Sequence, residues 1–191
     1  MLKTLRKILL MDRHTCPWWL AYTWDHRLRT LFQDPEDIVS PWVKEGDRVL
    51  DVGCGMGFFS IAMAGYVGGT GTVYALDIQQ PMLDILMKRA RLRGVESRIR
   101  PVLSDSRDLP VPVGLDFALA FWMLHEVDGQ AGLLKGISSV LKPGGSFLLV
   151  EPRVHVTKKA FEKELELCRT AGFTPAGTPE VALSRAVLFS R

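Results

Sequence analysis

Short apolar runs alternate with longer amphipathic segments along the chain from about residue 48 onward. Each run is bounded by glycine, proline or polar turn residues, as buried strands commonly are. Because strands that alternate with helices are typical of βαβ units, the pattern predicts an α/β fold built on a mostly parallel sheet. The predicted strands are residues 48–52, 72–77, 99–103, 117–121 and 146–151.

Apolar residues at helical spacing fill two of the longer intervals. Residues 81–93 carry apolar side chains three and four positions apart, start with a proline and are followed by a glycine, so they predict a helix with a defined start and stop. Phe161, Leu165 and Cys168 repeat at similar spacing before Gly172, which suits a helix end, and they predict a second helix.

The first 47 residues have a different composition, because they hold four of the five tryptophans. We expect residues 1–47 to form an aromatic-rich helical extension of a single domain whose core is residues 48–191. Asp34 and Pro35 predict a helix start within the extension, since a capping carboxylate precedes a proline of the first turn. We interpret the extension as a lid over the site, with simple packing of its rings on the sheet as the alternative.

Composition narrows the class of protein. Hydrophobic residues make up 47% of the chain and charged residues 24%, and no run approaches the ~20 apolar residues that cross a bilayer. The apolar run at residues 8–11 is too short for a signal peptide, and Cys16, Cys54 and Cys168 are widely spaced. We therefore expect a cytoplasmic protein with reduced thiols and no membrane segment.

The net charge of +3 argues against a nucleic-acid partner, which usually requires a broad basic face. Basic residues do gather between Lys88 and Arg107. Because this cluster begins on a predicted helix whose other face is apolar, a solvated surface is the preferred interpretation and an RNA-facing patch is the alternative.

A glycine-rich loop follows the first predicted strand. Gly53, Gly55 and Gly57 occupy alternate positions after Asp51, and such a loop lets the backbone approach a ligand closely. A dinucleotide site would have the spacing G-x-G-x-x-G, whereas here Phe58 follows the third glycine of a G-x-G-x-G run. A strand-end aspartate is also unfavourable beside a pyrophosphate and favourable beside a ligand that carries an ammonium and a sulfonium.

A second acid closes the next predicted strand. Asp77 lies 26 residues after Asp51, where a carboxylate can accept hydrogen bonds from both hydroxyls of a ribose. Alone, a glycine turn is most often a tight turn and a strand-end aspartate is most often a helix cap. The combination of both acids with the spaced glycines predicts an adenosine-type site.

From Val49 to the C-terminus the sequence resembles the class I S-adenosylmethionine-dependent methyltransferases. Their first motif looks like residues 51–57, and residues 141–145, before the fifth predicted strand, resemble another landmark of the family. The resemblance implies a Rossmann-like, doubly wound fold, in which helices cover both faces of a mostly parallel seven-stranded sheet. Its antiparallel C-terminal strand would come from a hairpin of residues 173–178 and 186–190.

The resemblance also implies that S-adenosyl-L-methionine is the cofactor. Asp77 would bind the ribose, Asp105 would receive the adenine amino group, and Phe121 would flank the site. The predicted cofactor-binding set is Asp51, Gly53, Cys54, Gly55, Gly57, Phe58, Asp77, Ile78, Met82, Asp105, Ser106 and Phe121.

Methyl transfer from a sulfonium is an in-line displacement, so the protein has to align acceptor and methyl group in a dry pocket. A general base is needed only if the accepting atom arrives protonated. His125, after the fourth predicted strand, is the candidate base, and a structural histidine bonded to a loop is the alternative. The candidates for the acceptor pocket are Trp18, Trp19, Tyr22, Trp24, Glu126, Glu151 and His155.

For Glu151 and His155, placed just past the fifth strand, the preferred interpretation is that they satisfy backbone groups of a loop. His14 and Cys16 supply only two ligands, whereas structural zinc takes four, so no metal is predicted.

The glycine spacing argues against a nicotinamide-dependent oxidoreductase. We expect a methyltransferase with a small-molecule acceptor; an RNA or protein acceptor and a non-catalytic cofactor-binding protein are the alternatives, and the sequence determines neither the acceptor nor the oligomeric state.

Overall fold

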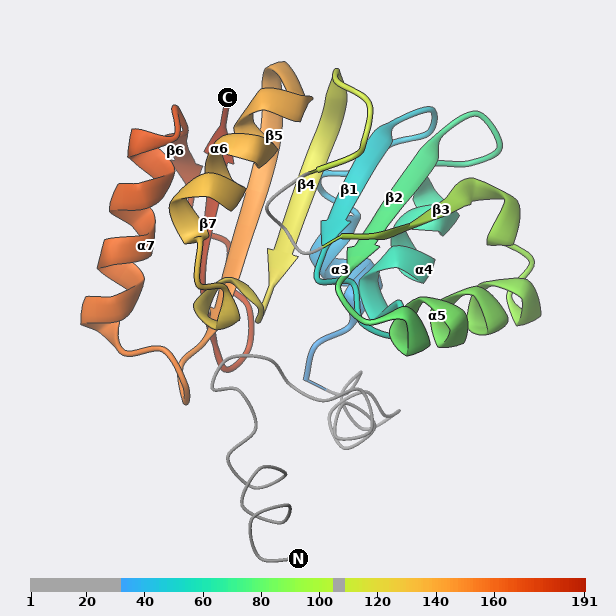
Figure 1. Cartoon of the computed structure of the whole chain (residues 1–191), viewed down its shortest axis with the longest axis horizontal. Coiled ribbons are helices and arrows are strands. Elements are labelled where there is room, and N and C mark those ends of the chain that lie inside the picture. The colour runs from blue at the N-terminus through green and yellow to red at the C-terminus, as the bar shows by residue number, and fades with distance from the viewer. Residues whose placement is uncertain (1–31, 105–108) are drawn as a thin grey trace, which may run out of the picture.

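The computed structural model describes residues 32–104 and 109–191, and these form one layered α/β domain around a seven-stranded sheet (Figure 1). The strand order is β3-β2-β1-β4-β5-β7-β6; β7 is antiparallel to both β5 and β6, and the other neighbouring pairs are parallel. This confirms the predicted Rossmann-like fold with its antiparallel C-terminal strand. The strands are β1 (Arg48–Val52), β2 (Thr72–Asp77), β3 (Ile99–Leu103), β4 (Leu115–Phe121), β5 (Leu141–Pro152), β6 (Thr174–Gly177) and β7 (Ser184–Ser190).

Helices cover both faces of the sheet, as predicted (Figure 1). On one face lie α3 (Pro35–Val39), α4 (Phe58–Tyr66) and α5 (Gln80–Leu92), and on the other lie α6 (Gln130–Val140) and α7 (Lys158–Thr170). Two 3₁₀ turns, η2 (Glu96–Arg98) and η3 (Leu124–Glu126), complete the helical elements of the described residues.

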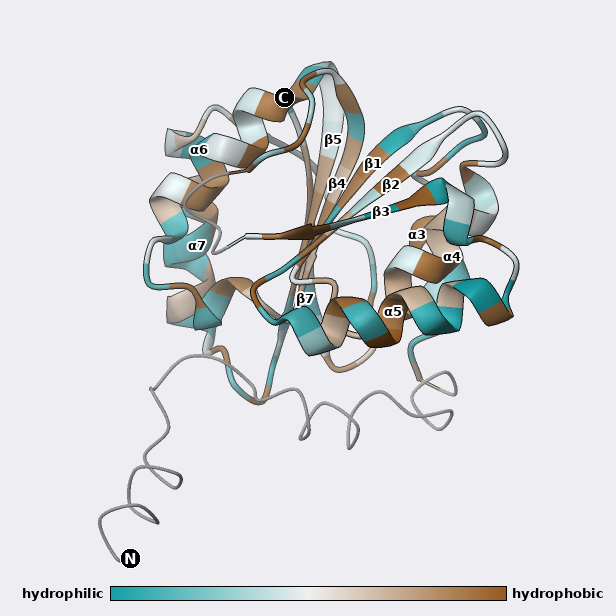
Figure 2. Ribbon diagram, turned by 45° about the vertical axis from the view of Figure 1, so that its right-hand side comes forward, coloured by the Kyte–Doolittle hydropathy of each residue, from teal (hydrophilic) through white to brown (hydrophobic). Residues whose placement is uncertain are grey.

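Each face of the sheet has its own hydrophobic core. Successive side chains of a strand point to opposite faces, so Val49 of β1 belongs to the core under α4 and α5, whereas Leu50 belongs to the core under α6 and α7. Figure 2 shows hydrophobic residues along the central strands and hydrophilic residues on the outward turns of α5 and α7. Burial on both faces explains why the strands are nearly continuous apolar runs.

The helix boundaries follow the capping residues. Asp34 caps α3 by accepting a hydrogen bond from the Glu36 backbone N–H at 2.9 Å, with Pro35 in the first turn. Thr157 caps α7 in the same way through the Ala160 backbone N–H. Gly94 and Gly172 follow α5 and α7 with φ of 68° and 94°, the left-handed conformation that glycine adopts without strain.

The fifth strand is longer than predicted. It begins at Leu141 rather than at residue 146, because Leu141 pairs with Leu115 of β4 across an irregularity in the register. Gly144 and Gly145, near the start of β5, form hydrogen bonds with Arg191, the residue after β7. The Gly144 N–H donates to the Arg191 carbonyl, and the Arg191 N–H donates to the Gly145 carbonyl. Residues 141–145, which the sequence placed before the fifth strand, are therefore part of it.

The parallel strands bring their carboxyl ends to one edge of the sheet. The strand order reverses between β1 and β4, which is where α/β sheets of this kind bind ligands. The start of β7 lies at the same edge, since Ser184 pairs with Pro152 at the end of β5. Within residues 32–104 and 109–191, no helix is both long enough and apolar enough to pass through a membrane.

Candidate functional site

The glycine loop between β1 and α4 lies at the edge where the strand order reverses. Gly53, Gly55 and Gly57 all have positive φ, of 68°, 53° and 86°. Their surroundings differ: a Cβ at Gly57 would lie 2.1 Å from Leu86 Cδ1, and one at Gly53 would lie 3.0 Å from Met123 Cβ. A Cβ at Gly55 would meet nothing within 4 Å. Two of the glycines therefore serve packing, and Gly55 is the one whose missing side chain leaves open space.

Asp77, at the end of β2, is bonded to this loop. Its Oδ2 accepts the Gly55 backbone N–H at 2.9 Å, and its Oδ1 accepts the Gln79 backbone N–H at 2.9 Å. Burial raises the pKa of the carboxyl, while these N–H groups oppose the rise. Each carboxylate oxygen can accept more than one hydrogen bond, so both retain capacity for hydroxyl donors such as those of a ribose.

Asp51 is the more deeply buried of the two acids, with 2% of its surface exposed. The Ser60 hydroxyl donates to its Oδ2 at 2.5 Å. Burial raises the pKa of Asp51 to about 7, and the charge of Asp77 adds to this effect while the Ser60 hydrogen bond opposes it. A cation placed beside this carboxyl would favour its charged form.

The other predicted cofactor residues have more varied surroundings. The Cys54 side chain is buried in the core under α4, and burial raises the pKa of its thiol. Phe121 is also buried there, with its ring centroid 4.3 Å from that of Phe59. Ile78 is exposed at the end of β2, Met82 is buried in α5, and Phe58 starts α4. Asp105 and Ser106 lie outside the described residues.

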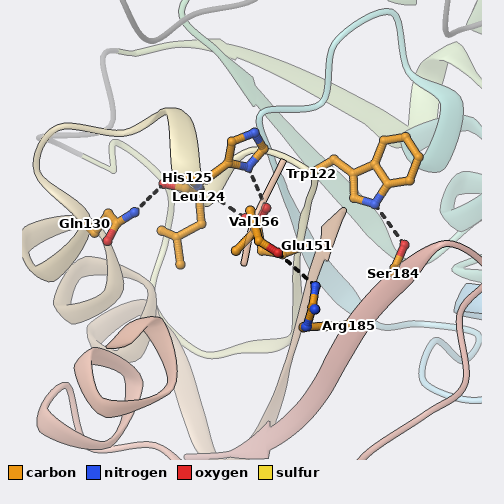
Figure 3. A network of polar contacts seen from close by, with 8 residues as sticks. All are labelled: Trp122, Leu124, His125, Gln130, Glu151, Val156, Ser184 and Arg185. Carbon is orange, nitrogen blue, oxygen red and sulfur yellow. Dashed lines mark hydrogen bonds and ion pairs between the residues drawn. The ribbon is translucent and has the colours of Figure 1, made fainter. Parts of the chain in front are cut away.

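A histidine held by a buried glutamate lies at the carboxyl ends of β4 and β5 (Figure 3). His125 Nδ1 is 2.5 Å from Glu151 Oε2, and the His125 backbone N–H donates to Glu151 Oε1 at 3.2 Å. Glu151 lies within β5, as the predicted strand of residues 146–151 has it, and is fully buried, so the interpretation of Glu151 as a loop residue is wrong. It does satisfy a backbone group, and it binds the imidazole ring as well.

Two further residues surround this pair. The His155 ring stacks on the His125 ring, with centroids 6.1 Å apart and planes 8° from parallel. Glu164 of α7 is 3% exposed, and its Oε2 has no hydrogen-bond partner. Burial raises the pKa of Glu164 to about 7, and the charge of Glu151 adds to this rise. The sequence analysis missed Glu164, although its position between Phe161 and Cys168 at helical spacing signals an acid on an apolar face.

The charges around His125 outweigh the effect of its burial. Burial lowers the pKa of the imidazole, but the hydrogen bond to Glu151 and the charges of Glu151, Glu126 and Glu164 raise it, and the net pKa lies above its usual value. Glu126 belongs to the same 3₁₀ turn, η3, as His125. The candidate base His125 thus lies close to carboxylates from η3, β5 and α7.

Trp122 connects this edge to the loop before β7. Its backbone is left-handed, with φ of 56°, and its indole Nε1–H donates to the Ser184 hydroxyl at 2.9 Å (Figure 3). From the other side, Gln33 Nε2 donates to the Ala182 carbonyl at 2.8 Å. The predicted pocket aromatics Trp18, Trp19, Tyr22 and Trp24 lie outside the described residues.

A separate groove of about 830 Å³ lies between α7 and the β6–β7 hairpin. It reaches the carboxyl edge at Ser184 and Arg153, and Phe161 and Leu165 of α7 form part of its wall. Neither Gly55 nor Asp77 lines it, so it is distinct from the glycine loop.

Comparison with known proteins gives consistent matches. A family model described as a methyltransferase domain matches residues 49–145. A demethylmenaquinone methyltransferase of Lactobacillus johnsonii is 34% identical over 129 residues, which cover 65% of this chain and 53% of the relative. The chain spans about half the length of the curated relatives that it matches.

Solved structures match over a larger part of the chain. A SAM-dependent methyltransferase from Aquifex aeolicus superposes with a TM-score of 0.82 at 24% identity, covering 92% of this chain and 99% of the other. The [4+2]-cyclase SpnF superposes with a TM-score of 0.66 at 27% identity, covering 76% of this chain and 59% of the other. The Aquifex match supports the fold, and the cyclase match indicates that relatives of this fold differ in their chemistry.

Proposed function

The chain belongs to the methyltransferase domain family, and from this premise we propose that it binds S-adenosyl-L-methionine and transfers the methyl group to a small molecule. The observation that carries the proposal is the open space at Gly55, next to the buried carboxylates of Asp51 and Asp77. This arrangement fits the cofactor, because a cation and a hydroxylated ribose are the groups that two such acids would bind.

Each acid has a separate role in this proposal. Asp77 binds the ribose hydroxyls through oxygens already oriented by the Gly55 and Gln79 N–H groups. Asp51 lies on the side of the ammonium group, where a positive charge restores the ionised form that burial disfavours. When bound, the cofactor supplies a methyl group activated by a positive sulfur. The protein's own task is to align that group with the acceptor and to exclude water.

The acceptor is proposed to be a quinone-type small molecule, by similarity to the Lactobacillus johnsonii relative. Residues 1–47 are proposed to form a lid over it. Gln33 supports this role, because it is 2% exposed and ties the described end of the extension to the loop before β7. We place the reaction in the cytoplasm, following the spacing of the cysteines.

Calorimetric titration tests the cofactor assignment. The protein is titrated in parallel with S-adenosylmethionine, S-adenosylhomocysteine and NAD. Binding of the first two alone at about micromolar affinity, or ~8 kcal/mol, is expected. Binding of NAD alone would assign an oxidoreductase, and failure to bind S-adenosylmethionine would leave only the fold.

A second candidate is a protein that keeps the cofactor site for a purpose other than methyl transfer. The match to the [4+2]-cyclase SpnF favours this candidate, since that protein is named for a different reaction. Cofactor binding without production of S-adenosylhomocysteine, with a quinol acceptor present, is the result that would select this candidate.

A further inference from the structure

The residues around His125 form a second group of ionisable side chains, separate from the proposed cofactor residues. They come from η3, β5, the segment after β5, and α7: His125, Glu151, His155 and Glu164. Across the part of the chain that the structure describes, no group of three or more His, Cys, Asp or Glu side chains is arranged to hold a metal ion. Two imidazoles beside two carboxyls are groups that can hold and transfer protons.

The hydrogen bond between His125 and Glu151 determines which ring nitrogen of His125 can accept a proton. Because a carboxylate accepts hydrogen bonds, Nδ1 carries the proton that is directed at Glu151 Oε2, 2.5 Å away. Nε2 then holds the free lone pair, and it points away from Glu151 (Figure 3). The His125 side chain is 23% exposed while that of Glu151 is fully buried, so only the histidine is open to an incoming molecule. This is the geometry of an oriented general base.

Packing and hydrogen bonding account for only part of the buried carboxyl of Glu164. Its carboxyl lies on the buried side of α7 between Phe161 and Cys168, and Oε2 has no hydrogen-bond partner. A buried unsatisfied polar group destabilises the fold, and an apolar side chain would fill this position without that cost. The carboxyl has a side-chain hydrogen bond with Gln130 and electrostatic contact with Glu151 and His125.

We propose that His125 is the general base of the methyl transfer, that Glu151 orients it, and that buried Glu164 is a positioning residue that adjusts its basicity. The inference rests on the proposed function and narrows its acceptor to molecules that arrive with an acidic hydroxyl, such as a phenol, a hydroquinone or an enol. The groups that face His125 are Glu151 from β5, Glu126 from η3, Glu164 from α7 and the stacked His155. Glu164 in turn faces Glu151, His125, Gln130 and Cys168.

The proposed step balances without a further reactant. His125 Nε2 accepts the proton of the acceptor hydroxyl, and the electron pair of that O–H bond remains on the acceptor. The acceptor uses it, at the oxygen or through the ring at a neighbouring carbon, to form the bond to the methyl carbon. The carbon–sulfur bond breaks with its electron pair on sulfur, and a methylated ring carbon afterwards loses its own proton to solvent.

An NMR titration of the full chain, loaded with S-adenosylhomocysteine, tests the roles of both residues without needing turnover. The ring signals of His125 are assigned with His125→Asn and followed from pH 5 to 9 in the wild type, in Glu164→Gln and in Glu162→Gln. Glu162 is a matched control, because it lies on the same helix and is exposed. We expect the Nδ1–H tautomer in all three proteins. We expect the midpoint of His125 to fall in Glu164→Gln alone, because a nearby negative charge is lost.

The same measurement can overturn the inference. An Nε2–H tautomer would exclude His125 as the base, and an unchanged midpoint in Glu164→Gln would reduce Glu164 to a structural residue. Both results are independent of the acceptor.

A kinetic measurement separates this inference from the proposed function. With a reduced naphthohydroquinone as probe, His125→Asn is expected to lower kcat at least about 100-fold while the Kd for S-adenosylmethionine is unchanged. Loss of cofactor binding already in the wild type would defeat the proposed function. Binding with undiminished turnover in His125→Asn would defeat only the inference about the base, and wild-type binding without methylation of the probe would overturn the acceptor class.

Discussion

Two buried carboxyls in this protein have pKa values raised to about 7, Asp51 beside the glycine loop and Glu164 beside His125. They share the cause, which is burial, but their neighbours differ. Asp51 accepts a short hydrogen bond from Ser60, whereas Glu164 has an oxygen with no hydrogen-bond partner. Similar pKa values therefore arise in a carboxyl that we propose binds beside a cation and in one that we propose acts on a neighbouring histidine.

The two carboxyls also differ in how the chain positions them. Asp51 and Gly55 belong to one short motif, so their proximity is local. Glu164 lies near His125 because α7 packs against β4 and β5, in the core that α6 and α7 cover. The following predictions test whether the two regions are independent, from the largest expected effect to the smallest.

Gly55→Val is expected to reduce S-adenosylmethionine affinity by more than about 100-fold, or ~2.7 kcal/mol, because its side chain would occupy the open space at the loop. Calorimetry measures the affinity. Gly144→Val is the matched control, since Gly144 also has positive φ and an added Cβ there meets nothing within 4 Å. Equal loss of binding in both variants would show that backbone strain, not the ligand site, is responsible.

Glu164→Gln is expected to weaken the dependence of stability on pH. The folded pKa of about 7 exceeds the ordinary value of 4.5, so the folded state binds more protons between these values. The free energy of unfolding therefore falls as pH rises from about 4.5 to 7, by up to about 3 kcal/mol for this group. Urea denaturation at pH 5 and pH 8 measures the difference. A slope in Glu164→Gln as steep as in wild type and Glu162→Gln would contradict the assignment.

Asp77→Ala is expected to weaken S-adenosylmethionine binding by ~1 to 3 kcal/mol, because the ribose hydroxyls lose their acceptor. The fold is expected to remain intact, which circular dichroism checks. Unchanged affinity would refute the assigned role of Asp77 while leaving the His125 cluster unaffected.

Asp51→Asn is expected to remove a pH dependence of cofactor affinity. In the wild type, the cation prefers ionised Asp51, so the Kd for S-adenosylmethionine should fall as pH rises toward 7, by at most about tenfold per pH unit. Titrations at pH 5.0, 5.75 and 6.5 measure this below the range near pH ~7.7 in which an α-amino group loses its proton. A flat wild-type profile would place the ammonium group away from Asp51.

The sequence predicted the elements whose signals are local. The alternation of apolar runs, the glycine loop and the caps at Asp34 and Gly172 gave strands and helices at nearly the positions observed. The extension of β5 to Leu141 was missed because it depends on pairing with β4 and on contacts with Arg191. Such contacts join residues that are far apart in the sequence, so a short stretch of sequence carries no signal for them.

In the candidate site, too, the sequence predicted the local features and missed those that depend on long-range packing. His125 was selected from its position after β4, but its orientation depends on Glu151, 26 residues later, and its electrostatics depend on α7. Glu164 looked like one acid among several in a charged helix. Only the packing of that helix distinguishes it from Glu162 and Glu166, which are exposed.

One serine hydroxyl constrains how this architecture can change. Ser184 Oγ accepts from Trp122 Nε1, lies 3.4 Å from Gln33 Nε2 and donates to the Ala182 carbonyl at 3.1 Å. Three stretches that are far apart in the sequence thus meet at a single atom at the carboxyl edge of the sheet. Exchanging the loop before β7 for that of a relative would break the contacts of Ser184 with Gln33 and Trp122, so the exchanged loop has to supply a hydroxyl at the same place.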